Sequence, residues 1–407
     1  MRPERSVHTG VQSAMDVTDV SQDANPFEAG PFSWLRGMVS ATSRGSHDLW
    51  RSILITVFIT WVPLAILSVV EGRAVAATPR ESFFYDLAAY GRYLIAAPLF
   101  VLAVRVYLPQ LGLTVRNFVQ AGLIADTHRA HFDALVASTR RFLGSPWTDA
   151  LLLLLAYIST IGLSRVLYPT EVSTWVARAG AGPFDLSLAG WWRTFVSQPF
   201  FQALLNAWLC RVLVWAWFLW RVSRMPLRLV AGHPDHMGGL RFNIMPVRGF
   251  TILAFGIGAM AAGSVAESIL YDGQPAASFR LLIVGQVLVV LLIFLGPLFS
   301  LFGPLSHLHW RGTFEYGRLA SKLGHQFEAR WTSRGHQVDA EALAAPDFSA
   351  TTDLFSIAAN VREMNLLVLD SRAVIALTIA TLLPYLPVLL AIVPLDEVVS
   401  LVLKTLM

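Results

Sequence analysis

Seven long apolar stretches divide the chain, and they constrain its fold more than any other feature. Each is close to the ~20 residues that a helix needs to cross ~30 Å of hydrocarbon. The stretches are continuous rather than alternating, which excludes a membrane β-barrel. With 55% hydrophobic and 14% charged residues, the sequence predicts an all-α, polytopic integral membrane bundle with about seven transmembrane helices. The predicted spans are 52–70, 91–109, 149–167, 193–213, 250–270, 281–302 and 373–394.

Lysine and arginine are unequally distributed between the loops, which predicts the orientation of the chain. With the N-terminus in the cytoplasm, the inner segments carry about three times as many Lys and Arg residues as the outer ones. The bias predicts a multi-pass protein of the bacterial inner membrane, with a cytoplasmic N-terminus and an outer C-terminus. Pro384 and Pro387 interrupt the last span. If that span is a re-entrant hairpin, the C-terminus returns to the cytoplasm.

The segments between the spans predict a simple domain organisation. Residues 1–47 are rich in Ser, Asp, Thr, Gly and Pro, a composition typical of a disordered cytoplasmic tail. Residues 48–302 form a membrane bundle of six helices, with an amphipathic cytoplasmic helical segment at 110–146. Residues 303–372 form a second cytoplasmic helical segment, and 373–407 the last membrane helix and a tail. The amphipathic pieces form either a helical layer on the cytoplasmic face or separate interfacial helices on the membrane surface.

A row of polar residues recurs every fourth position along the fourth predicted span. An i+4 row stays roughly on one face of a helix, so Gln198, Gln202 and Asn206 could line a water-filled substrate path. The alternative is that these amides hold neighbouring helices together, as Gln and Asn side chains do in membranes. The complete row is Thr194, Gln198, Gln202, Asn206 and Cys210.

The other intramembrane signals are few. Small residues form a ridge on the fifth span, the usual surface for close helix packing within a bundle or between subunits. Arginines near the span ends can extend their side chains to the headgroups, and Glu267 lies close to the outer end of its span. The predicted centre of the bilayer is nearly free of charge, which argues against an ion-coupled transporter. The ridge consists of Ala254, Gly258, Ala262 and Ala266.

The loop between the fourth and fifth spans contains the most distinctive motif. Pro234 restricts the backbone before it, Asp235 can cap a turn with its own side chain, and Gly238 and Gly239 allow a positive φ. The motif therefore predicts a specific turn at the cytoplasmic mouth of the bundle. It reads His233, Pro234, Asp235, His236, Met237, Gly238, Gly239 and Leu240.

Three interpretations of this loop remain open. It is a structural turn, or it is part of a site where Arg221, Arg224 and Arg228 bind an anion or a lipid headgroup. In the third interpretation, His233, Asp235 and His236 bind a metal, with His307 or His309 as further ligands. No HExxH motif or cysteine pair supports the metal, and the sequence assigns no cofactor.

The HPDxxGGL loop resembles that of a bacterial family of polytopic inner-membrane proteins of unknown function. Residues 187–192 (SLAGWW) and the segment from Asp353 to Met364 share the resemblance, which covers about residues 47–407. It implies that His233, Pro234, Asp235, Gly238 and Gly239 matter to the family. It implies no activity, cofactor or catalytic residue.

Three classes of function follow. We favour an uncoupled pore or transport protein, with the polar row as its path and the HPDxxGGL loop at its mouth. The alternatives are a membrane-embedded scaffold or sensor that binds a cytoplasmic partner, and a metal-dependent membrane enzyme. The expected partners are the lipid bilayer and anionic lipid headgroups, with homo-oligomer formation left open. The sequence predicts no nucleic-acid surface.

Overall fold

The computed structural model describes residues 25–28, 46–167, 174–177, 185–332 and 346–392. Within these ranges the chain is built of helices, and the only β-type pairings are two isolated bridges, Ile124 with Leu227 and Ala177 with Leu186. The predicted all-α membrane bundle is confirmed. The last two residues of the seventh predicted span lie outside the described part of the chain.

Six of the described helical stretches are long and apolar enough to cross a membrane. A seventh arises if the bent pair Asp126–Leu143 and Pro146–Gly162, which turns by 48°, counts as one span. The protein is therefore a multi-pass membrane protein. The six stretches are Leu49–Val70, Leu87–Gln120, Leu188–Ser223, Arg241–Leu270, Ala276–Trp331 and Ser371–Ala391.

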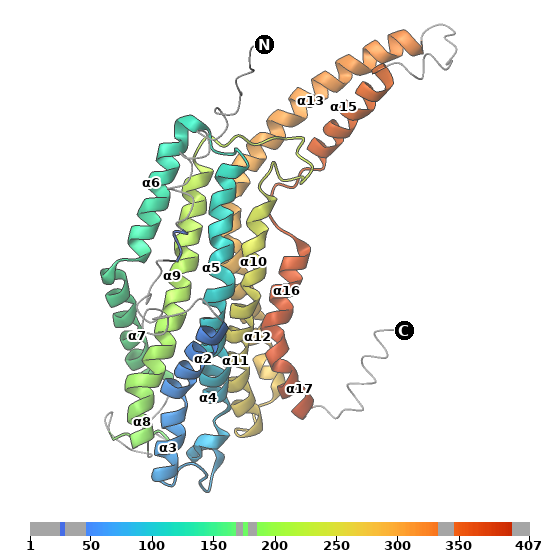
Figure 1. The fold of residues 1–407 in the computed structure, drawn as a ribbon. Coiled ribbons are helices and arrows are strands. Elements are labelled where there is room, and N and C mark those ends of the chain that lie inside the picture. Colours follow the sequence, from blue (N-terminus) through green and yellow to red (C-terminus); the bar gives the residue numbers. More distant parts are fainter. Residues whose placement is uncertain (1–24, 29–45, 168–173, 178–184, 333–345, 393–407) are drawn as a thin grey trace, which may run out of the picture.

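The first half of the chain contains the stretches Leu49–Val70 and Leu87–Gln120 and the bent pair Asp126–Leu143 and Pro146–Gly162 (Figure 1). Pro63 starts a new helix after Trp61, and Pro146 starts another after the bend at Gly144, since proline suits the first turn of a helix. The elements are α2 (Ser46–Thr60), α3 (Val62–Val70), η1 (Pro79–Glu81), η2 (Phe83–Tyr85), α4 (Leu87–Ala89), the π-helix η3 (Tyr90–Ala96), α5 (Ala97–Gln120), α6 (Asp126–Leu143) and α7 (Pro146–Leu167).

The second half supplies the remaining crossings. The elements are α8 (Leu188–Trp192), the π-helix η4 (Arg193–Ser197), α9 (Gln198–Ser223), η5 (Arg241–Ile244), α10 (Met245–Gly249), α11 (Thr251–Leu270), η6 (Ala276–Phe279), α12 (Arg280–Leu295), η7 (Gly296–Leu301), α13 (Phe302–Trp331), α15 (Pro346–Arg362), α16 (Ser371–Leu382), η8 (Leu383–Tyr385) and α17 (Leu386–Ile392). Pro384 and Pro387 fall in the last crossing, which continues through the short 3₁₀ turn η8.

Four of the six stretches, with 30 to 56 residues, are longer than a membrane requires. Leu87–Gln120 has 34 residues and Leu188–Ser223 has 36, or about 50 Å each at ~1.5 Å per residue. Residues 110–120 are therefore a continuation of α5 rather than a separate helix, and α6 packs beside α9. Phe132 of α6 lies edge-on to Phe218 of α9 at 6.0 Å. The predicted segment 110–146 thus extends the bundle itself.

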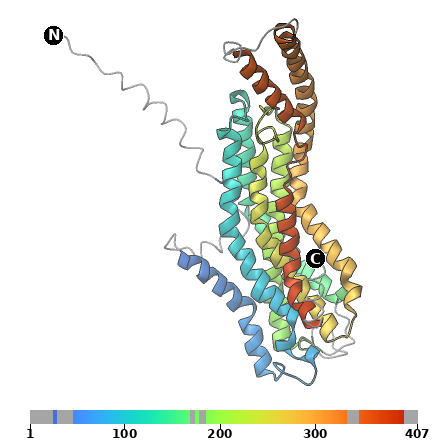
Figure 2. The same ribbon diagram turned by 90° about the vertical axis from the view of Figure 1, so that its right-hand side faces the viewer.

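Helices α13 and α15 form an antiparallel arm that projects from one end of the bundle (Figures 1 and 2). Helix α13 continues directly from α12 and η7, so the arm starts inside the bundle. We call this the arm end, and the opposite end, where α3 and α8 lie, the far end (Figure 1). The charge bias predicts that the arm end is cytoplasmic.

Part of the predicted disordered tail is ordered. In the described segment Asn25–Glu28, Phe27 is completely buried, with its ring edge-on to Trp215 and Phe218 of α9. Asn25 binds α5 on the other side. Within the predicted tail 1–47, these four residues therefore have specific contacts, because one aromatic and one amide find a complementary slot that local composition does not reveal, and Ser46 and His47 begin α2. The other residues of 1–45 lie outside the described part of the chain.

The small-residue ridge lies in the centre of the bundle. Ala254, Gly258, Ala262 and Ala266 are all buried on α11, which contacts η3, α4, α5 and α16. A side chain at Gly258 would overlap the backbone carbonyl of Thr381 on α16. The ridge is thus used for packing within one chain.

Candidate functional site

The HPDxxGGL loop is organised around the carboxylate of Asp235. Its Oδ1 accepts hydrogen bonds from the backbone N–H groups of Met237 (2.8 Å) and Gly239 (3.1 Å), and Oδ2 accepts from Arg241 (3.2 Å). The Nδ1 atom of His233 lies 2.8 Å from Oδ1. One carboxylate therefore holds both ends of the turn.

The electrostatics of Asp235 follow from these contacts. Burial raises the pKa of the carboxyl group, but the N–H donors of Met237, Gly239 and Arg241, together with His233, outweigh burial and hold the pKa below its ordinary value of 3.8. The group is ionised at neutral pH. Asp235 thus acts as an acceptor that shapes the loop.

The glycines of the motif allow the loop to follow this path. Gly238 and Gly239 have φ of 63° and 93°, and His236 also has a positive φ of 55°. A Cβ on Gly238 would lie 2.8 Å from the Leu308 side chain of α13. The backbone carbonyl of His236 accepts a hydrogen bond from the N–H of Asn365, just after α15 (2.8 Å). The loop is therefore wedged between the two helices of the arm at their base.

The candidate metal ligands are not assembled into a metal site. Within the described residues no three His, Cys, Asp or Glu side chains are grouped as a metal ion requires. His309 is engaged elsewhere, with its Nδ1 3.0 Å from the carbonyl oxygen of Val361. The oxygens of Asp235 accept backbone hydrogen bonds instead. Of the three interpretations of the loop, the contacts favour the structural turn.

A cavity of about 660 Å³ lies beside this loop, between the end of α9 and the start of α13. Arg224, His307 and Arg311 supply positive or ionisable groups, and no Asp or Glu of the described residues lines it. Of the three arginines expected to bind anions, Arg224 lines this cavity and Arg221 and Arg228 do not. The remaining lining residues are Trp220, Ser223, Met225, Pro226, Leu227, Leu229, Ser300, Gly303, Pro304 and Leu308.

Sequence reasoning singled out His307 only as a metal ligand and missed Arg311 as a site residue. The spacing of His307 and Arg311 in the sequence could have indicated that they belong to one site. Residues four apart on a helix share a face, so His307 and Arg311 lie together on α13. Their meeting with Arg224, which is more than 80 positions earlier, depends on the packing of α9 against η7, from which α13 continues.

The polar row of α9 makes contacts between helices. Gln198 accepts a hydrogen bond from the Tyr93 hydroxyl of η3 (2.8 Å). Gln202 donates to Asn206 (3.2 Å), and Asn206 donates to the carbonyl of Leu152 on α7 (3.3 Å). Gln198 and Asn206 therefore join α9 to η3 and α7, and Gln202 supports Asn206 within α9. This is the packing alternative that the sequence left open.

Carboxylates at the far end cap helix starts. Asp86 accepts from the N–H of Ala89 and from the indole of Trp175 (2.9 Å). Glu267 accepts from the N–H of Ala88 (2.9 Å) and Glu71 from the N–H of Leu188 (2.9 Å). These oxygens satisfy backbone N–H groups that have no partner within the helix they begin. These carboxylates therefore connect neighbouring segments at the far end, where Glu267 binds the start of α4 through Ala88.

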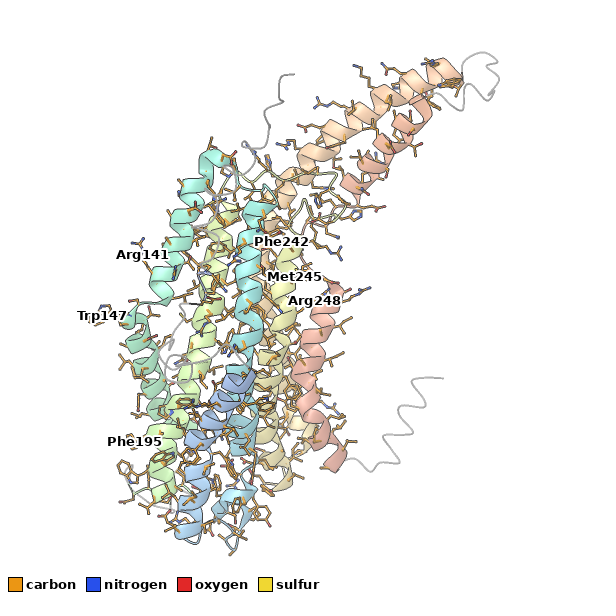
Figure 3. All side chains as sticks on the ribbon, in the orientation of Figure 1. Arg141, Trp147, Phe195, Phe242, Met245 and Arg248 are labelled. Atoms are coloured by element: carbon orange, nitrogen blue, oxygen red, sulfur yellow. The ribbon has the colours of Figure 1, made fainter. Side chains whose placement is uncertain are left out.

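The bend between α6 and α7 carries side chains that are typical of a membrane–water interface. Figure 3 shows Arg141 and Trp147 on either side of it, pointing away from the bundle. Both line a second cavity of about 580 Å³, and the Trp147 side chain is 83% exposed. A tryptophan and an arginine at the end of an apolar helix are typical membrane-interface anchors.

Comparison with known proteins adds nothing to this site. No family model matches the chain, and neither a curated protein nor a solved structure matches it.

Proposed function

We propose that this protein is a membrane-embedded scaffold whose α13–α15 arm binds a protein partner. The observation that carries the proposal is the arm itself, a pair of helices that continues a membrane span and projects beyond the bundle (Figures 1 and 2). The charge bias of the loops supports a cytoplasmic arm.

The base of the arm is braced by the HPDxxGGL segment. A Cβ on Gly312 of α13 would lie 2.6 Å from Cβ of Ala231 and 3.1 Å from Val361 of α15. The hydrogen bond from Asn365 to His236 joins the end of α15 to the loop. The distinctive loop therefore has a role in this proposal, because it fixes the direction of the arm relative to the membrane bundle.

The arm presents apolar side chains that the described residues leave exposed. Phe314 and Leu319 on α13 are 58% and 52% exposed, and Phe355 on α15 is 46% exposed. Arg318 and Lys322 lie nearby on α13. Exposed apolar groups among charged ones are typical of protein-binding surfaces.

The pore has less support. Gln198 and Asn206 make interhelical hydrogen bonds, Gln202 donates to Asn206 within α9, and the central ridge of α11 is packed without room for a side chain at Gly258. Neither of the two cavities described above is lined by the polar row.

Site-specific photocrosslinking in native membranes tests the scaffold. A photoreactive residue at Leu319 is expected to give one discrete adduct with another protein, and the adduct should disappear in a Phe314→Asp, Phe355→Asp double variant. The matched control position is Leu282, which is 50% exposed on the apolar helix α12 and should label lipid. Circular dichroism of the double variant checks that it is folded.

The pore makes the opposite prediction. If Leu319 gives no protein adduct, while purified protein in liposomes passes small solutes in a way that Gln202→Leu abolishes, the scaffold is wrong and the polar row is a path.

A further inference from the structure

We propose that the cavity between the end of α9 and the start of α13 binds the phosphate group of an anionic phospholipid, with Arg224, His307 and Arg311 as its ligands. This proposal does not depend on the proposed protein partner, because the cavity lies at the base of the arm and not on its exposed surface.

The charges around the cavity favour an anion. Three basic or ionisable side chains line it, and in the described part of the chain no carboxylate does. Arg311 has one ion pair, to Glu315 on its own helix at 3.7 Å, and both side chains are more than half exposed. Exposed pairs of this kind contribute little, so Arg311 can turn to a phosphate. Arginine suits phosphate because its planar donors match the phosphate oxygens.

Arg224 is held in place for this role. Its guanidinium lies over the Trp220 ring, with Cζ 5.2 Å from the ring centroid. In the described part of the chain neither the Arg224 guanidinium nor the His307 ring has a hydrogen bond to another residue. Stacking fixes the plane of the guanidinium while its N–H groups stay available.

On both walls of the cavity, the basic side chains that line it follow a run of exposed apolar ones. On α9 the exposed side chains Leu213, Trp217 and Trp220 precede Arg224. On the other wall Leu292, Phe299 and Phe302 are exposed before His307 and Arg311. Such a boundary, with tryptophan beside arginine, is typical of the membrane–water interface.

The apolar part of the lining decides between a lipid and free phosphate. Met225, Leu227 and Leu308 offer contacts that inorganic phosphate cannot use, whereas the glycerol and upper acyl carbons of a phospholipid can. The volume of about 660 Å³ is in the usual range for a ligand site. A phospholipid is therefore the ligand that can contact both the basic and the apolar residues of the cavity.

Native mass spectrometry of the full-length protein from nanodiscs tests the proposal. The probes are nanodiscs with equal parts of phosphatidylglycerol and phosphatidylcholine. The wild type is expected to retain phosphatidylglycerol preferentially. The double variant Arg224→Gln, Arg311→Gln should lower that preference about thirtyfold, since each basic residue near anionic lipid contributes about 1 kcal/mol. The matched control is Arg318→Gln, two turns beyond Arg311 and outside the cavity lining.

A second variant tests the proposal if the double variant folds poorly. Gly303 lines the cavity and has nothing within 4 Å of where a Cβ would lie, so Gly303→Phe should fill the cavity without changing charge. It is expected to lose phosphatidylglycerol as well. Equal retention of the two lipids by the wild type, or unchanged retention in both variants, overturns the proposal.

Inorganic phosphate distinguishes the two sources of the anion. Added at millimolar concentration, it is expected to leave the bound phosphatidylglycerol in place. Displacement of the lipid by phosphate, with phosphate binding lost in Arg224→Gln, would show a site for a soluble phosphate compound and overturn the lipid assignment.

Discussion

The side-chain amide of Asn25 donates a hydrogen bond to the carbonyl oxygen of Leu108 at 2.6 Å, across 83 positions of sequence. The same contact explains why residue 112 is glycine, since a Cβ there would lie 2.6 Å from Cγ of Asn25. A short N-terminal segment is thereby inserted between α5 and α9.

Phe27→Ala should release this segment. The ring is fully buried against Trp215 and Phe218, and removal of a buried Phe costs about 3–5 kcal/mol. We expect much faster hydrogen exchange at the Phe27 amide, which is bonded to Oδ1 of Asn25, with the helices unchanged. Phe84→Ala, at a half-exposed position, is the control. Unchanged exchange in Phe27→Ala would mean that the segment does not depend on this ring.

Asp235 should make the protein sensitive to acid. Because the folded-state pKa lies below the ordinary value of 3.8, the folded state binds fewer protons than the unfolded state there. Its contribution to stability is present above pH ~4 and is lost as the pH falls through the lowered pKa. Unfolding followed by circular dichroism between pH 6 and pH 2 measures this loss.

Asp235→Ala should remove that component of the pH dependence and cost about 2 kcal/mol at neutral pH, as expected for hydrogen bonds to a charged group. Asp133→Ala is the comparison, since its pair with Arg129 is exposed and should contribute less than about 0.5 kcal/mol. Equal effects of the two substitutions would contradict the central role of Asp235 in the loop.

Gly258→Leu should destabilise the bundle strongly. A side chain there meets the backbone of Thr381, which cannot turn aside as a side chain can, and overpacking of this kind costs about 1–3 kcal/mol or more. The control is Gly285→Leu on α12, where nothing lies within 4 Å. Thermal unfolding in one detergent compares the two variants, and a small effect at Gly258 would show that α11 and α16 separate easily.

Asn206→Leu should weaken the contact of α9 with α7. The amide donates to Leu152 at 3.3 Å, and such membrane hydrogen bonds contribute about 0.6–2 kcal/mol. We expect a lower unfolding temperature and no change in solute flux in liposomes. Leu209→Ala, at an exposed position one turn away, is the control. A loss of flux with unchanged stability would support the path instead.

The membrane fold was predictable from local sequence. The apolar stretches had the length of spans, and the helical segment predicted at 303–372 contains most of α13 and all of α15. Pro234, Asp235 and the glycine pair indicated a tight turn, and the structure has one there. In each case the signal lies within a few residues, because helix length, amphipathic spacing and turn chemistry are local properties.

The site was less predictable. The sequence pointed to Arg221, Arg224 and Arg228 together, but only Arg224 lines the cavity, where it meets His307 and Arg311. Equally, the amides of α9 could line water or bind helices, and nothing in their spacing distinguished the two. The outcome depended on Tyr93 and Leu152, which come from other helices.

The sequence by itself determined that this chain is a helical membrane protein, because apolar length and the unpaired backbone of lipid-exposed chains leave few other folds. Only the tertiary structure decided that Phe27 is buried, that α13 and α15 form one arm, and that the HPDxxGGL loop braces it. These features depend on which helices pack together and on which residues of each helix are in contact. Helix packing requires side chains of complementary shape from segments that are far apart in sequence, so no single segment determines it.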